Sequence, residues 1–184
     1  MRTFKMLVTY KSSRHSDSRG FFSEIYSKKD LLDYGIDGDF IQDNQSFSSE
    51  IGTLRGLHYQ APPFAQGKLV RCARGAILDV AVDIRRKSPT FGNWESFMLS
   101  QENGLQLYVP IGFAHGFVTL RSETEIIYKC TDYYNPKAEG SILWSDPILK
   151  IDWQLDGDPI LSEKDRNAPF FKDLQTPFVY GVNS

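Results

Sequence analysis

Turn-forming residues break this chain into short apolar runs, and that spacing limits the folds it can adopt. Clusters of Gly, Pro, Asn, Asp and Ser recur at short intervals, as at 18–20, 61–63, 102–104 and 135–136. The runs between them are rich in β-branched and aromatic residues, and aromatic residues make up 14% of the sequence. Short strands at this spacing are typical of a sandwich, a jelly roll or a barrel. The sequence therefore predicts an all-β fold.

Alternation of period two is clearest over residues 76–84, where the aliphatic side chains at 78, 80, 82 and 84 share one face. Asp79 and Asp83 fall on the other face, which is either solvated or turned toward a polar barrel interior. Two short helices are expected, one at 28–34 with Ser27 as N-cap and one near 162–165. From residue 167 onward we expect a tail that docks through its phenylalanines. Further strands are expected at 20–26, 40–46, 53–59, 68–73, 94–99, 105–109, 115–120 and 124–131.

The composition of the 184 residues bounds the class of protein. Lys and Arg number 21 against 23 Asp and Glu, so the formal net charge is −2. That balance gives no electrostatic reason to expect binding to nucleic acid or to an anionic membrane surface. No apolar run approaches the ~18 residues of a membrane span, and the N-terminus lacks the apolar core of an export signal. Cys72 and Cys130 lie far apart without a CxxC motif, which favours buried thiols in a reducing compartment. We therefore expect one cytoplasmic domain spanning residues 1–184.

Histidine is scarce, and two of the three histidines lie in segments that suggest a shared cavity. His15 lies in a polar stretch and is most simply an exposed loop residue, whereas His115 follows a Pro-x-Gly turn and His58 lies at another predicted strand. This arrangement is similar to the two motifs of a cupin barrel. Metal-binding cupins supply a His-x-His in the first motif, but here the second position is Gln60. The sequence therefore predicts no metal site and leaves the His58 imidazole free for proton transfer.

Three cations accompany these histidines. Arg19, Arg55 and Lys68 together favour an anionic ligand such as a phosphate or diphosphate, although for each one alone ordinary surface charge is the simpler interpretation. Arg55 precedes His58 by an odd number of residues, so the two share a site only if Gly56 breaks the regular pleat. No P-loop, GxGxxG or GxSxG motif is present, which argues against the enzyme classes that depend on them.

A series of short motifs gives the chain a specific resemblance. The motifs are DSRGFFSE (17–24), QDNQS (42–46), LRGLHYQ (54–60), QGKLVRC (66–72), DVAVDIRRKSPTFG (79–92), PIGFAHGFVTL (110–120), YKCTDYYNP (128–136), EGSILWSD (139–146) and LSEKD (161–165). With them the chain resembles the dTDP-4-dehydrorhamnose 3,5-epimerase family over most of its length. The resemblance implies a cupin-type jelly roll with short peripheral helices, a homodimer, and neither metal nor cofactor.

The implied reaction inverts carbon 3 and carbon 5 of dTDP-4-dehydro-6-deoxy-D-glucose to give dTDP-4-dehydro-L-rhamnose. The alternative is a mono-epimerase that inverts only one of these carbons. The resemblance implies His58 as the base and Asp165 as the carboxylate that orients its imidazole. It implies Tyr128 as the acid on the other face of the sugar, although the alternation of Tyr128 with Ile126 by itself favours core packing. Lys68 is expected to stabilise the enolate oxygen.

Further positions match substrate contacts of the family. Arg19 and Arg55 resemble a diphosphate clamp, and Tyr134, or its neighbour Tyr133, is placed to stack on thymine. The segment that carries Arg19 and Glu24 is expected to reach into the site of the partner subunit. Asp83 is expected to support these residues from inside the barrel. The remaining matched contacts are Gln42, Asp43, Asn44, Lys68, His115, Glu139 and Lys164.

Overall fold

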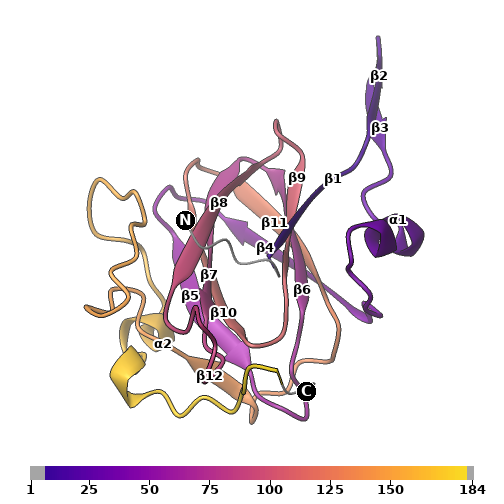
Figure 1. The fold of residues 1–184 in the computed structure, drawn as a ribbon. Helices are drawn as coiled ribbons and strands as arrows, with labels where there is room; N and C mark the ends of the chain where they lie inside the picture. Colours follow the sequence, from indigo (N-terminus) through magenta and orange to yellow (C-terminus); the bar gives the residue numbers. More distant parts are fainter. Residues whose placement is uncertain (1–6, 182–184) are drawn as a thin grey trace.

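The chain folds into antiparallel strands arranged as a cupin-type jelly roll, as the sequence predicts (Figure 1). The computed structural model describes residues 7–181. One sheet has the strand order β1 (Val8–Lys11), β9 (Leu105–Val109), β6 (Lys68–Arg74), β11 (Thr124–Cys130) and β4 (Gln42–Ser48). The other has the order β12 (Glu139–Ser141), β5 (Leu54–Gln60), β10 (Phe113–Thr119), β7 (Ala76–Asp83) and β8 (Trp94–Ser100).

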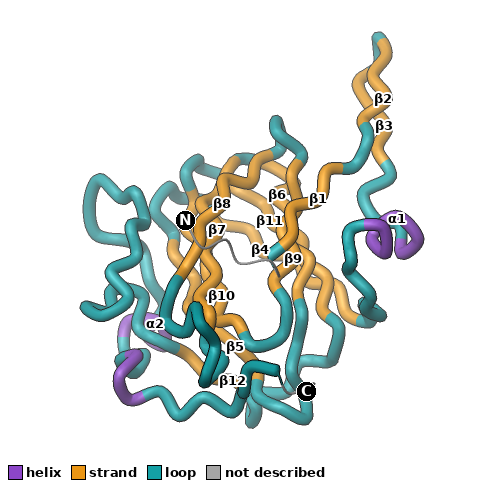
Figure 2. The backbone as a smooth tube through the Cα atoms, in the orientation of Figure 1, coloured by secondary structure: helices purple, strands orange, loops and turns teal. Residues whose placement is uncertain are grey.

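The predicted strands are confirmed, with bounds that shift by a few residues. The sequence analysis missed β1, β12 and the first strand of a small hairpin formed by β2 (Arg14–Asp17) and β3 (Gly20–Ser23). His15 therefore lies in a strand of this hairpin and not in a loop, although it is exposed as expected. The hairpin stands away from the two large sheets, as Figures 1 and 2 show. Its second strand, β3, exposes Phe21 and Phe22, which are 55% and 69% accessible to solvent.

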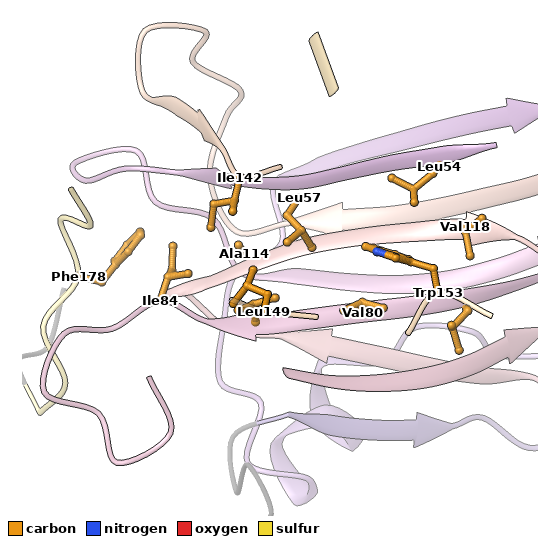
Figure 3. Close-up of a cluster of buried hydrophobic side chains, with 12 residues drawn as sticks. Leu54, Leu57, Val80, Ile84, Ala114, Val118, Ile142, Leu149, Trp153 and Phe178 are labelled. Atoms are coloured by element: carbon orange, nitrogen blue, oxygen red, sulfur yellow. The ribbon is translucent and has the colours of Figure 1, made fainter. Parts of the chain in front are cut away.

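Strand β7 is buried along its whole length because both of its faces are covered. One face joins an apolar cluster between the sheets that includes Ile77, Ala81 and Leu107. The other packs under segments from the C-terminal third of the chain, including Trp153 and Phe178 (Figure 3). Asp79 and Asp83 are consequently both 0% exposed, so the solvated-face alternative for these two residues is wrong.

Local sequence signals position the helices as predicted. Ser27 accepts a hydrogen bond from the Asp30 backbone N–H and caps α1 (Lys28–Asp33), and the chain leaves the helix at Gly35 with φ of 75°. Ser162 caps α2 (Glu163–Arg166) in the same way. A 3₁₀ turn, η1 (Phe171–Asp173), begins the tail. Phe171 packs on the outer cluster and Phe178 is buried in it, whereas Phe170 stays 42% exposed. No helix between residues 7 and 181 combines the length and apolar character of a membrane span.

Candidate active site

Polar side chains line one end of the space between the sheets because the register of three strands brings them together. Lys68, Cys130 and Gln42 are cross-strand partners on β6, β11 and β4. Two residues further along each strand, Tyr128 is paired with Val70 and Asn44. Since side chains of period two share one face, these rows point to the same side of the sheet. Further along β6 and β11, the side chains on this face belong to the apolar cluster that includes Cys72 and Ile126.

Two connected cavities occupy this end of the barrel, each of about 380 Å³. Both are lined by His58, Lys68 and Tyr128, so these three residues mark their junction. The first, which we call the amide lobe, is also lined by Gln42, Asn44, Tyr59, Gln60, Gln66, Cys130, Tyr134 and Glu139. The second, which we call the histidine lobe, is also lined by Gln45, Ser46, Arg55, Val70, His115, Phe117, Ser162 and Asp165.

His58 and Tyr128 lie in different sheets that face each other. His58 belongs to β5 and Tyr128 to β11, so the imidazole and the phenol reach the cavity from opposite walls. Burial raises the pKa of the Tyr128 phenol, which therefore keeps its proton at neutral pH. Tyr128 also packs, partly buried, against the apolar cluster between the sheets, so the core packing that the strand pattern favours accompanies its position in the cavity lining.

A buried carboxylate fixes the His58 ring. Asp165 Oδ1 lies 2.5 Å from His58 Nε2, and Asp165 is only 3% exposed. The Ser162 hydroxyl donates to Asp165 Oδ2 over 2.9 Å. Burial alone raises the pKa of Asp165, but these hydrogen bonds and the nearby imidazole outweigh it and hold the pKa below its usual value. Asp165 therefore stays ionised beside His58.

Lys68 is held without a protein partner. Among residues 7–181 no hydrogen bond or ion pair reaches its ammonium group, although it lines both lobes. Burial lowers the pKa of this ammonium because the charged form loses hydration. An amine in this position has all its donors available to a bound ligand.

Gly56 breaks the pleat of β5, as the sharing of one site by Arg55 and His58 requires. In the pairing with β10, His58 is opposite His115 but Arg55 is opposite Phe117, so the register shifts between them. Gly56 has φ of 132°, and a Cβ built on it comes within 2.5 Å of the Gly116 backbone. Arg55 thereby reaches the histidine lobe while remaining exposed.

The expected role of Asp83 is wrong, and Asp79 is the aspartate of β7 that contacts a residue of the site. Asp83 accepts hydrogen bonds from Arg85, Ser88 and Thr90 and lines neither lobe. Asp79 instead lies 2.9 Å from His115 Nε2, and His115 lines the histidine lobe.

Three predicted contacts bind each other at the rim of the amide lobe. Glu139 forms an ion pair with Lys164 and accepts a hydrogen bond of 2.9 Å from the Tyr134 hydroxyl. Tyr134 and Glu139 line the lobe, and Lys164 adjoins it through this pair. Tyr134 is 55% exposed, so its ring is open to a stacking partner.

Strand β4 divides its predicted contacts between two faces. Gln42 and Asn44 line the amide lobe, with the Gln42 amide donating to Asn44 over 3.1 Å. Asp43 alternates to the other face, where it is exposed and paired with Lys129 at 2.9 Å. Within one chain Asp43 therefore does not reach the cavity.

Arg19 and Glu24 also lie outside the cavity of their own chain. Arg19 lies in the turn at the tip of the β2–β3 hairpin, where its side chain is 87% exposed and paired only locally with Asp17. Glu24 is exposed just after β3. The structure thus separates these two predicted contacts from the other residues of the site.

Gln60 occupies the position of the second histidine in the His-x-His motif of metal-binding cupins, and its side chain forms hydrogen bonds with backbone groups. Its amide group donates to the Tyr133 carbonyl over 2.9 Å and accepts from the Asn135 N–H over 2.8 Å. It therefore anchors the loop that carries Tyr134. Between residues 7 and 181, no three His, Cys, Asp or Glu side chains converge where they could hold a metal ion. Cys72 and Cys130 are buried free thiols, as predicted.

The sequence analysis missed the contributions of Asp79, Ser162 and Gln60. A signal existed for Asp79, since its strand alternation already placed it opposite the aliphatic face. Ser162 was recognised as a helix cap, but its second bond to Asp165 depends on tertiary geometry.

Comparison with known proteins gives a consistent result. A family model described as dTDP-4-dehydrorhamnose 3,5-epimerase matches residues 3–173. The chain is 50% identical over 167 residues to the enzyme of that name from Sinorhizobium fredii, which covers 91% of this chain and 86% of the relative. It is 53% identical over 154 residues to the enzyme of that name from Salmonella typhimurium, covering 83% and 84%. The solved dTDP-6-deoxy-D-glucose-3,5-epimerase of Legionella pneumophila, in complex with dTDP-4-keto-L-rhamnose, is 45% identical with a TM-score of 0.89, covering 95% of this chain and 92% of that one.

Proposed function

The chain belongs to the dTDP-4-dehydrorhamnose 3,5-epimerase family, and we propose that it inverts carbon 3 and carbon 5 of dTDP-4-dehydro-6-deoxy-D-glucose. The observation that carries this proposal is the placement of His58 and Tyr128 on opposite walls of one cavity. Inversion at carbon requires removal of a proton from one face of the sugar and delivery of a proton to the other. Two groups on facing sheets meet that requirement, whereas two groups on one wall would not.

His58 removes the proton alpha to the 4-keto group through its Nδ1. Because Nε2 is bonded to the ionised Asp165 carboxylate, the neutral ring carries its hydrogen on Nε2 and leaves the Nδ1 lone pair bare. When Nδ1 accepts the proton, the imidazolium that forms is stabilised by the adjacent carboxylate.

Lys68 stabilises the enolate that results. Its ammonium lines both lobes at their junction and has no competing acceptor among the described residues. A fixed donor beside a developing oxyanion contributes several kcal/mol, of the order of 3 kcal/mol for one donor.

Tyr128 then protonates the enolate carbon from the other side. Its raised pKa keeps the phenol protonated, which is the form that can donate. The same sequence of removal and delivery acts once at carbon 3 and once at carbon 5, since both flank the carbonyl.

The nucleotide occupies the amide lobe, where Tyr134 offers an exposed ring for thymine and Gln42, Asn44 and Glu139 offer hydrogen bonds. Arg55 lies beside His58 in the histidine lobe and contacts the phosphate bonded to the sugar. Lys164 and Asp43 contribute to binding only if the substrate or a partner subunit draws them from their present ion pairs.

A homodimer completes the site. Arg19 and Glu24 lie in or next to the β2–β3 hairpin, which stands away from the two large sheets (Figure 2). The hairpin exposes Phe21 and Phe22, and neither Arg19 nor Glu24 lines the cavities of its own chain. Insertion of this hairpin into a second copy buries those rings and carries Arg19 toward the partner's substrate. We place the enzyme in the cytoplasm, a reducing compartment that suits its two free buried thiols.

Deuterium exchange tests the reaction. The purified enzyme is incubated with dTDP-4-dehydro-6-deoxy-D-glucose in deuterated water, and deuterium at each carbon is measured by NMR. We expect incorporation at carbon 3 and carbon 5, together with the L-rhamno product. Incorporation at one carbon alone would establish the mono-epimerase alternative, and absence of exchange at both would refute the proposal.

A further inference from the structure

A second histidine–aspartate pair lies beside the His58–Asp165 pair. His115 Nε2 is 2.9 Å from Asp79 Oδ1 and 3.0 Å from Oδ2. Asp79 is 0% exposed and His115 is nearly buried, yet His115 lines the histidine lobe. Burying a carboxylate lowers the stability of the fold unless hydrogen bonds or a counter-charge compensate for its lost hydration. The presence of a carboxylate at this position therefore needs a reason.

Asp79 differs from Asp83, the other aspartate on the same face of β7. Asp83 receives hydrogen bonds from the Arg85 backbone and guanidinium and from the hydroxyls of Ser88 and Thr90. Asp79 has His115 as its single hydrogen-bond partner among residues 7–181. Asp83 thus stabilises a turn, whereas the Asp79 carboxylate is dedicated to one imidazole.

The strand register explains how Asp79 reaches His115. On β10 and β7, His115 is directly opposite Ala81, and Asp79 is the diagonal neighbour two residues along. The small Ala81 side chain leaves room for the imidazole to turn toward Asp79. On its other side, His115 is directly opposite His58 of β5. The two imidazoles are therefore neighbours on one wall, each tied through Nε2 to its own carboxylate.

We propose that Asp79 is a positioning residue that fixes His115 with a bare Nδ1, which accepts a hydrogen bond from a hydroxyl of the ketosugar. The carboxylate accepts the Nε2 hydrogen and so selects the neutral tautomer whose Nδ1 is an acceptor. This inference rests on the proposed function, because the hydroxyl belongs to the sugar whose carbons His58 deprotonates. The hexose ring of the substrate carries hydroxyls only at carbons 2 and 3, since carbon 4 is a ketone and carbon 6 a methyl group.

This arrangement makes the His115–Asp79 pair a determinant of specificity. A site built to bond a hydroxyl leaves its own buried group unpaired when that hydroxyl is missing. The enzyme should therefore discriminate against a 2-deoxy or 3-deoxy ketosugar analogue, and the preference should depend on the orientation of His115.

A double-mutant cycle tests whether Asp79 acts through His115. Asp79→Asn keeps the volume of the side chain and removes its charge, and His115→Gln keeps a donor toward position 79 but loses the imidazole. We expect each variant to lower kcat/KM by roughly 10- to 100-fold, the scale of one lost bond that leaves a polar group unpaired. The double variant should be no more than about twofold worse than His115→Gln, because coupled residues are not additive. Each variant should also have a smaller ratio of kcat/KM for the natural ketosugar to kcat/KM for its 2-deoxy or 3-deoxy analogue, the two analogues being tested in turn.

The matched control is Asp83→Asn, which removes an equally buried carboxylate from the same face of β7. It should lower thermal stability but change kcat/KM and the discrimination by less than about twofold. If the losses of Asp79→Asn and His115→Gln multiply in the double variant, or if Asp79→Asn behaves like Asp83→Asn, the inference is overturned.

A measurement on the unmodified enzyme keeps the inference testable if a variant does not fold. The ¹⁵N shifts of histidine-labelled protein report which ring nitrogen carries hydrogen. His115 should show the Nε2–H tautomer, and an Nδ1–H tautomer would overturn the inference. Deuterium exchange by the unmodified enzyme distinguishes a failure of this inference from a failure of the proposed function. If the unmodified enzyme exchanges deuterium but the effects of Asp79→Asn and His115→Gln are additive, only the role of Asp79 is refuted.

Discussion

Replacing Asp165 with Asn removes the charge behind the proposed base while leaving its shape. In the present structure the carboxylate is 3% exposed, lies 2.5 Å from His58 Nε2, and accepts a further hydrogen bond from the Ser162 hydroxyl. The amide of Asn can donate to Nε2, which would place the ring hydrogen on Nδ1 and block the lone pair that must accept the substrate proton. Even without that change of tautomer, the imidazolium formed during the reaction loses its buried counter-charge.

The size of the effect follows from that burial. Breaking a buried, hydrogen-bonded charge pair by removing one partner costs about 3–5 kcal/mol. At about 1.4 kcal/mol per factor of ten, this corresponds to a loss of roughly 10²- to 4 × 10³-fold in kcat. Substrate affinity should change little, because Asp165 touches the substrate only through His58. The expected signature is therefore a fall in kcat with KM nearly constant.

The assay is deuterium incorporation followed under single-turnover conditions, with Glu163→Gln as the control. Glu163 lies two residues before Asp165 in α2 but is exposed, and its carboxylate contacts only Arg166 and Asn167 among the described residues. Its replacement should leave the rate within about twofold of the unmodified enzyme, since exposed ion pairs contribute little. An Asp165→Asn enzyme that retains more than a tenth of the rate would show that the carboxylate does not activate His58.

Three further variants address the other roles. Tyr128→Phe should keep proton removal, seen as washout of substrate deuterium, while inversion falls about 10²-fold or more, because only the acid is lost; equal loss of both would contradict the division of roles. Lys68→Met should lower kcat by about 10²- to 10³-fold yet leave the melting temperature unchanged or higher, because the ammonium has no partner among the described residues; a lower melting temperature together with normal kcat would exclude it from the enolate site. Asp83→Asn should destabilise the fold by about 3–5 kcal/mol at pH 7. Burial raises the pKa of Asp83, but the bonds from Arg85, Ser88 and Thr90 lower it further, so its net pKa lies below the usual value. Its contribution is present above the unfolded pKa and lost as pH falls through the folded one, so the stability curves of variant and unmodified protein should converge below about pH 4, as urea titrations can measure.

Helix caps, turn clusters and strand alternation depend on residues only a few positions apart in the chain, and the elements predicted from them are present in the structure. A Ser hydroxyl caps the N–H three residues later whatever surrounds the helix, which explains the success at Ser27 and Ser162. Turn clusters and period-two runs located most strands for the same reason. The motifs from residue 17 to residue 165 in one order were enough to indicate the family.

Other features depended on segments that meet only in the folded chain. Alternation divides β7 into two faces but cannot say what covers them, and the outer cover comes from residues 142–178. Whether Asp79 or Asp83 serves the site likewise depends on which strand brings His115 within reach. Residue order therefore determined the local elements and the chemistry available, because those depend on neighbours along the chain. The tertiary structure alone decided which acid meets which base, because hydrogen bonds of 3 Å between distant residues are set by strand register.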